Sequence, residues 1–167
     1  AKGATLFARG EGIVQGTDPL GSPEFYFTCT SGGGGKHGQI FRYVPTIARD
    51  TIGEAYPGGP IMLSGLPDAN LQLFFESPDR SVYSFGDNLT VAPNGDLMVC
   101  EDGYENIVAN YLRGVTPEGK AYAFGMVRVQ SETAGICFAP DGQTMFLNVY
   151  SPTMTLAITG PFEGVAS

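Results

Sequence analysis

The chain is poor in residues on which many hydrolytic centres depend. It has one histidine, His37, and no Gly-x-Ser-x-Gly motif. A single histidine excludes a zinc site made from several histidines and a histidine-rich catalytic centre. A Ser-His-Asp triad would have to use His37, which lies in a glycine-rich stretch, so serine-hydrolase chemistry is not expected.

Cysteine is also scarce, with Cys29, Cys100 and Cys137 as the only three. This odd, small number does not make a disulfide framework, and at most one pair can form. Cys137 lies in the apolar run GICFA, which predicts a small buried hydrophobic residue. Cys100 is followed by two acids and Cys29 by a polar, glycine-rich stretch, so both a core position and a ligand role remain open for them.

Positive charge is scarce as well. The 9 Lys and Arg residues are outnumbered by 17 Asp and Glu residues, which gives a net charge of −8 and a pI near 4.4. This balance argues against nucleic acid and anionic membrane as partners and favours multivalent cations. No run approaches the roughly 18 apolar residues of a membrane span, so none is expected.

Long amphipathic stretches are missing, whereas 24 Gly, 12 Pro and many β-branched and aromatic residues are present. This composition predicts an all-β fold, and the length of 167 residues suits a single domain, residues 1–167, with one core. Alternation and turn residues predict strands at residues 4–8, 12–15, 24–29, 39–44, 71–76, 81–85, 88–92, 96–101, 107–115, 120–128, 134–139, 144–149 and 154–159.

One turn pattern recurs along the chain, as VAPNGD, VTPEGK and FAPDGQ. Its prolines, Pro93, Pro117 and Pro140, follow one another at 24 and 23 residues, and two intervals make 47. A period of roughly 40 to 50 residues suits a four-stranded propeller blade. The sequence therefore predicts a β-propeller-like fold of about three to four antiparallel blades, in an incomplete ring that another copy would close.

The repeats carry acids ahead of one strand, at Glu11, Asp87 and Glu132, and a soft or polar residue at the end of the next, at Cys29, Cys100 and Asn148. Equivalent positions of successive blades surround one axis, so these residues are predicted to converge at a channel mouth. Converging carboxylates indicate cations. Two segments interrupt the pattern: residues 45–67 predict a long crossover, and residues 31–39 a flexible hairpin tip.

Taken in order, several motifs resemble the C-terminal half of the PhoX-type alkaline phosphatase family. They are RGEGIV, EFYFTCTSGG, GQIFRY, FFES, DNLTVAPNGDLMVCEDG, VTPEGKAYAF, SETAGICFAPDGQTMFLNV and TLAITGPFEG. The resemblance implies an exported β-propeller, periplasmic or extracellular, usually carried by the twin-arginine route. It also implies a phosphomonoesterase site in which carboxylates and a cysteine hold Fe³⁺ and Ca²⁺.

Carried over to this sequence, the resemblance assigns metal ligands and phosphate contacts. The best matches to the ligand motifs are Glu11, Cys100, Glu101, Asp102 and Glu132, with Asp87 and Asn88 as second choices. Arg9 and Arg113 are candidates to clamp phosphate oxygens, although a solvated surface role remains open for each.

Length is the main departure, because members of that family are usually more than twice as long. Three interpretations remain open: a fragment of a longer chain, a short homologue that closes its ring by self-association, or a degenerate structural remnant. The leading hypothesis is a metal-dependent phosphatase-like module acting on a small phosphate ester. The alternative is a non-catalytic, oligomer-forming propeller protein with structural Ca²⁺, favoured by the apolar strand LQLFF at residues 71–75.

Overall fold

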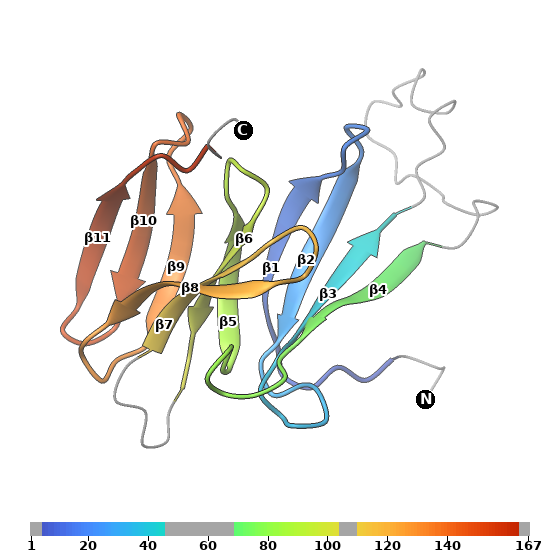
Figure 1. Cartoon of the computed structure of the whole chain (residues 1–167), viewed down its shortest axis with the longest axis horizontal. Helices are drawn as coiled ribbons and strands as arrows, with labels where there is room; N and C mark the ends of the chain where they lie inside the picture. Colours follow the sequence, from blue (N-terminus) through green and yellow to red (C-terminus); the bar gives the residue numbers. More distant parts are fainter. Residues whose placement is uncertain (1–4, 46–68, 104–109, 164–167) are drawn as a thin grey trace, which may run out of the picture.

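The computed structural model describes residues 5–45, 69–103 and 110–163, and within them it contains eleven β-strands and no helix. The strands form three antiparallel sheets, which lie side by side in Figure 1. The first sheet holds β1 (Gly10–Thr17), β2 (Pro23–Cys29), β3 (Gln39–Val44) and β4 (Asn70–Glu76). The second holds β5 (Gly86–Val91), β6 (Leu97–Glu101), β7 (Asn110–Val115) and β8 (Ala121–Val127), and the third holds β9 (Thr133–Phe138), β10 (Thr144–Val149) and β11 (Met154–Thr159).

The second sheet is packed on both faces. Strand β6 is buried along its whole length, and its side chains alternate between two cores because successive residues of a strand point to opposite faces. Leu97 and Val99 belong to a core shared with the first sheet, where they join Ile40 and Phe75. The opposite face forms a second core with the third sheet, built from Ala92, Met98, Cys100, Leu112, Ile136, Met145 and Leu147.

The first two sheets repeat each other in detail. Both are meanders whose strands pair in chain order, and both carry an extra residue in the last strand. That extra residue is Phe74 in β4 and Phe124 in β8. A shared bulge at the same place shows that the repeat in the sequence is a repeat in backbone geometry.

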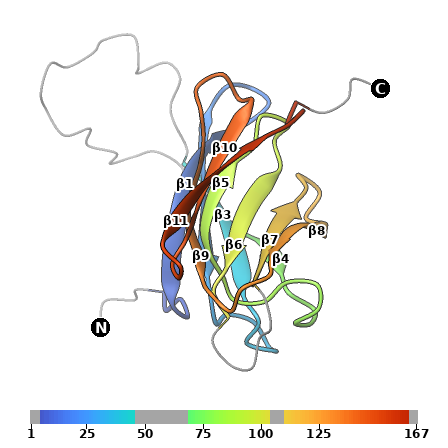
Figure 2. The same cartoon turned by 90° about the vertical axis from the view of Figure 1, so that its left-hand side faces the viewer.

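The first strands of the three sheets come together. Strand β5 contacts β1 on one side and β9 on the other, so these three strands form the region where the sheets meet. In the side view of Figure 2, strands β1, β5 and β10, one from each sheet, run steeply up and down the molecule. A site built from residues of several sheets is therefore expected near β1, β5 and β9.

The all-β prediction is confirmed, whereas the described residues define no closed ring, so the propeller and its blade count remain predictions. Most predicted strands are present, but those at 4–8 and 81–85 are wrong for their described residues. Phe7 instead packs edge-on against Phe27 and Phe41. The other segment follows a turn in which Asp79 Oδ1 accepts hydrogen bonds from Ser81. The predicted crossover at 45–67 falls almost entirely outside the described residues.

Candidate metal and phosphate site

A bulge in β1 presents Glu11. Gly10 pairs with Cys29 and Ile13 with Phe27, which leaves Glu11 and Gly12 together opposite one residue, Thr28. Strand β5 has the same bulge: Gly86 pairs with Glu101 and Leu89 with Val99, so Asp87 and Asn88 lie opposite Cys100. Strand register therefore confirms the predicted equivalence for Glu11 and Asp87. For Glu132 the prediction is wrong, because Gly135 holds the corresponding position in the third sheet.

The same register corrects the other predicted match. Cys29 occupies the place of Glu101, not that of Cys100, because these are the residues that pair with Gly10 and Gly86. In the third sheet, Asn148 pairs with Ala134 ahead of the corresponding bulge. Cys100 is thus displaced by one residue, and since side chains alternate in a strand, it points to the opposite face.

Left-handed backbone precedes both acidic bulges. Arg9 has φ of 51° and Phe85 has φ of 53°, values that few residues other than glycine adopt. Their carbonyl groups accept equivalent hydrogen bonds, from Thr30 N to Arg9 and from Asp102 N to Phe85, each 2.9 Å long. These two hydrogen bonds fix the backbone positions of Arg9 and of the buried Asp102.

Gly12 and Thr28 seat the second bulge against the first. The Thr28 hydroxyl donates to the Asp87 carbonyl at 2.7 Å and accepts from Gly12 N at 3.0 Å. A Cβ atom on Gly12 would lie only 2.4 Å from the Asp87 carbonyl oxygen, so this position needs glycine. The sequence did not predict a role for either residue, although the second glycine of the GEG motif could have indicated a close backbone contact.

Arginine 9 links acids from two sheets. Its guanidinium lies 3.3 Å from Glu11 Oε1 and 3.9 Å from Asp102 Oδ2. The side chain of Asp102 is only 3% exposed, whereas that of Arg9 is 44% exposed. The ion pair therefore joins a buried carboxylate to a cation that remains open to solvent.

Four predicted ligands share one electrostatic environment. Burial raises the pKa of Asp87, and the charges of Glu11 and Asp102 raise it further, while Arg9 lowers it. Burial also raises the pKa of Glu132, and Asp102, Asp87 and Glu11 add to that rise. Carboxylates that raise one another's pKa in this way are close enough to repel, and a bound cation would relieve that repulsion.

Asparagine 88 has both ends of its amide engaged. Its Nδ2 donates to Asp87 Oδ1 at 3.1 Å, and its Oδ1 accepts from Gly135 N at 2.7 Å. These bonds orient the Asp87 carboxylate and tie β5 to β9. In this arrangement Asn88 acts on the carboxylate cluster through Asp87.

Cysteine 100 is a buried member of the second core, with no exposed surface. Burial raises the pKa of its thiol to about 12, and Asp87 and Glu132 contribute to the rise, while the neighbouring Thr133 and Ile136 oppose it. A thiol in this environment stays protonated at neutral pH. Cys137, predicted to be buried, is exposed, so that prediction is wrong: its side chain projects from the outer face of β9.

Glutamate 101 and Arg113 are paired with each other. Arg113 Nε donates to Glu101 Oε1 at 2.7 Å, and both side chains are at most 5% exposed. Glu101 also accepts from the backbone N–H groups of Ser84 and Tyr111, and Arg113 donates to the Ser81 carbonyl. The pair braces the segment that leads into Asp87.

The side chains of the cluster are of a type that binds metal ions. Carboxylate oxygens are the donors that Ca²⁺ and Fe³⁺ prefer, and Glu11, Asp87, Asp102 and Glu132 supply them within one electrostatic environment. Among the described residues, however, no three His, Cys, Asp or Glu side chains are arranged to hold one ion. The carboxylates would have to approach one another on binding.

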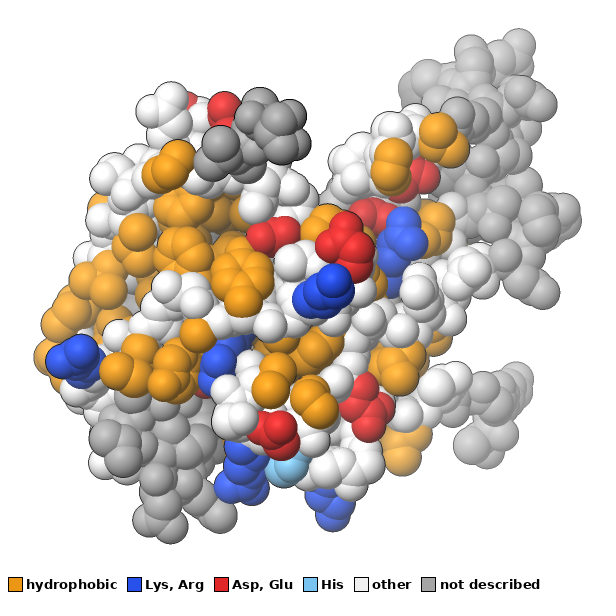
Figure 3. Space-filling model, viewed as in Figure 1, with side chains coloured by type: hydrophobic (Ala, Val, Ile, Leu, Met, Phe, Trp, Pro, Cys, Tyr) orange, Lys and Arg blue, Asp and Glu red, His pale blue; other side chains and the backbone are white. Residues whose placement is uncertain are grey.

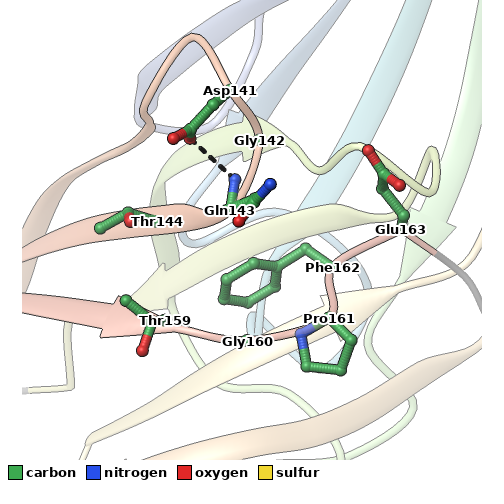
Figure 4. A pocket seen from close by; sticks show the side chains of 9 residues that line it. All are labelled: Asp141, Gly142, Gln143, Thr144, Thr159, Gly160, Pro161, Phe162 and Glu163. Carbon is green, nitrogen blue, oxygen red and sulfur yellow. Dashed lines mark hydrogen bonds between the residues drawn. The ribbon is translucent and has the colours of Figure 1, made fainter.

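A separate pocket of about 560 Å³ lies at the other end of the third sheet. Figure 4 shows Phe162 and Pro161 on one side and Asp141 and Gln143 on the other. Strand β10 starts there at Thr144 and ends at Val149, which pairs with Thr133 beside Glu132. The length of a strand therefore separates this pocket from the carboxylates.

These features define an all-β protein of repeated antiparallel sheets, with carboxylates gathered where the first strands meet. The family model described as Alkaline phosphatase PhoX matches residues 1–153, and the chain belongs to this PhoX alkaline phosphatase family. Its members are phosphatases that are generally metal-dependent and usually exported. A comparison with curated protein sequences gives no significant match. Within the described ranges, no helix is long and apolar enough to span a membrane.

Proposed function

We propose that this chain supplies a metal-dependent phosphomonoester hydrolase site of the PhoX type, with Glu11, Asp87, Asp102 and Glu132 as its oxygen ligands. One observation carries the proposal: these acids come from segments of three sheets, and the pKa values of Asp87 and Glu132 are raised by burial and raised further by the charges of the other acids. Evolutionary membership in a phosphatase family and this shared field support the same site.

The proposed cofactors are Ca²⁺ and Fe³⁺. Calcium takes about six to eight oxygen ligands in flexible geometry, which suits carboxylates on separate sheets that must close around an ion. When bound, the cations would polarise the phosphate ester and offset the negative charge that develops on its oxygens. Asn88 would hold Asp87 in orientation, because its amide already donates to that carboxylate.

Arginine 9 is the better candidate for contact with a phosphate group. Its guanidinium is partly exposed beside the carboxylates, and a guanidinium can grip two phosphate oxygens through a bidentate fork. Arg113 is buried against Glu101 and stacks on the ring of Tyr111 at 4.1 Å. We therefore assign Arg113 and Glu101 to positioning the segment before Asp87.

Cysteine 100 would serve as an iron ligand only after two changes. Its protonated thiol would have to ionise, and its side chain would have to leave the second core, where it packs against the third sheet. A ferric ion nearby favours the thiolate, so the first change accompanies binding. Within this proposal, the carboxylates are the primary ligands and Cys100 is secondary.

The assembly belongs to the proposal as well. Four-stranded antiparallel meanders are the units of β-propellers, and the first strands of propeller blades surround the central channel. We place the carboxylates at the mouth of such a channel, in a ring completed by a second copy of the chain or by another segment of the same propeller. We also propose an exported, periplasmic or extracellular location, because members of the family are usually exported.

One observation favours a second candidate, a non-catalytic protein that assembles through its edge strands with structural Ca²⁺. Leu71 and Leu73 on β4 and Phe124 and Met126 on β8 are 39–46% exposed. Hydrophobic side chains also gather over β8 and the third sheet in Figure 3. Exposed apolar edge strands are templates for association.

Hydrolysis of p-nitrophenyl phosphate separates the two candidates. Protein treated with chelator and then supplied with Ca²⁺ and Fe³⁺ should hydrolyse the ester, and Glu132→Gln or Asp87→Asn should lower kcat by about a hundredfold or more, because each removes a cation ligand. Glu118→Gln is the matched control, since Glu118 is an exposed turn acid at the far end of the second sheet.

Two results would contradict the catalytic proposal. A fully folded, metal-supplied protein without hydrolytic activity, or one whose activity survives both carboxamide substitutions, would reject the catalytic proposal. Retained Ca²⁺ in an inactive oligomer would then favour the structural candidate.

A further inference from the structure

The side chain of Arg9 contacts two of the four acids of the proposed metal site. It reaches Glu11 of the first sheet at 3.3 Å and Asp102 of the second at 3.9 Å, and its charge also acts on Asp87. The chain itself therefore neutralises part of the charge that a bound cation would neutralise.

The backbone of Arg9 is anchored, but its side chain is not enclosed. Thr30 N donates to the Arg9 carbonyl, and the left-handed φ of Arg9 is shared by Phe85 at the equivalent position of the second sheet. The backbone geometry thus belongs to the repeat. The side chain of Arg9 is 44% exposed and belongs to neither hydrophobic core, so its movement would expose no core.

The two equivalent residues differ in what they contact. Phe85 lies under the guanidinium of Arg80, with 5.3 Å from Arg80 Cζ to the ring centroid. Arg9 instead directs its own guanidinium to the carboxylates. The two sheets therefore share this backbone position, but only the first sheet places a cationic side chain there.

We propose that Arg9 is an exchangeable counter-ion: its guanidinium pairs with Glu11 and Asp102, and a cation that enters the carboxylate cluster takes its place there, which leaves the guanidinium available to a phosphate group. This inference rests on the proposed function, because it takes the cluster as the metal site. It adds a direct link between metal loading and the freedom of the arginine.

The exchange predicts that Arg9 opposes metal binding. Tb³⁺, a luminescent probe for Ca²⁺ sites, is titrated into chelator-treated protein, and its luminescence reports binding. Ca²⁺ is then added to displace the bound Tb³⁺. Arg9→Gln should bind both ions about tenfold more tightly than the unsubstituted protein, because a unit positive charge within a few ångströms is removed. Arg9→Lys keeps the charge and should bind within about threefold of the unsubstituted protein.

A control separates local exchange from overall charge. Lys120→Gln makes the same change in net charge at the β7–β8 turn, the opposite end of the second sheet, and should leave both affinities unchanged. Circular dichroism and urea unfolding establish that each variant is folded before titration.

A second readout follows Arg9 directly. The ¹⁵Nε–¹Hε signal of Arg9, assigned by its loss in Arg9→Lys, should shift and exchange faster with water as Ca²⁺ is added. Equal cation affinities for Arg9→Gln and the unsubstituted protein, or an unchanged Arg9 signal at saturation, would overturn the exchange alone. Failure of both proteins to bind Tb³⁺ or Ca²⁺ would overturn the exchange and the proposed function together.

Discussion

Glu11 and Asp87 occupy the same position in two successive sheets, each as the first residue of a bulge in a first strand. The bulges touch, because Thr28 opposite Glu11 donates a hydrogen bond to the Asp87 carbonyl. Repetition of one backbone unit has therefore placed two carboxylates side by side, where a single copy would have placed one.

Gly12 controls the approach of these two bulges. Gly12→Ala would place a Cβ atom 2.4 Å from the Asp87 carbonyl oxygen, so the sheets must shift and the free energy of unfolding should fall by about 1–3 kcal/mol. Gly10→Ala is a matched control two residues away, because a Cβ atom there meets nothing within 4 Å. Urea unfolding of both variants tests this; equal stability of the two would contradict the packing account.

The buried pair of Glu101 and Arg113 should matter for stability more than for phosphate binding. Arg113→Met leaves Glu101 buried without its cation, which should cost about 3–5 kcal/mol. Glu101→Gln combined with Arg113→Met should cost less than Arg113→Met alone, because no buried charge remains. Chemical denaturation measures both; a double variant as unstable as the sum of the single variants would show that the pair is not coupled.

Sequence reasoning succeeded where local pattern decides structure. The turns with Pro and Gly and the alternating strands predicted most of the sheets, and the repeat predicted that Glu11 and Asp87 are equivalent. These features depend on neighbouring residues in the chain, which the sequence displays directly.

Features that depend on register were not predictable in the same way. Cys100 was matched to Cys29 because both are cysteines at or near a strand end, but their pairing partners show that Glu101 is the counterpart of Cys29. The pairing of Glu101 with Arg113 also depends on register across β6 and β7, which no local pattern shows. Glu132 lies ahead of its strand, outside the bulge, and joins the other acids only through the packing of β9 on β5.

The three thiols should differ sharply in reactivity. Cys137 is exposed, whereas Cys29 and Cys100 are buried, and burial raises the pKa of both buried thiols. Native protein should therefore react with DTNB at one thiol per chain, and protein in urea at three. Cys137→Ser should abolish the native reaction, whereas fast labelling of Cys100 in the native state would contradict its place in the core.

The carboxylate cluster should make metal-free protein less stable as pH rises. The pKa of Glu132 is raised in the folded state above its ordinary value of 4.5, so the folded protein holds more protons than the unfolded protein between those two values. Its stability should fall across that window and stay reduced above it. Glu132→Gln should flatten this decline in urea unfolding with EDTA from pH 4 to pH 8; an equally steep decline in the variant would contradict it.

The central claim is that Glu11, Asp87, Asp102 and Glu132 together hold metal. Elemental analysis by ICP-MS, on protein purified without chelator and with its oligomeric mass recorded on the same sample, tests it most directly. We predict calcium and iron in a fixed ratio to protein, and loss of both from a folded Asp87→Asn, Glu132→Gln double variant. A folded protein without bound metal, or a double variant that retains the full complement, would contradict the account.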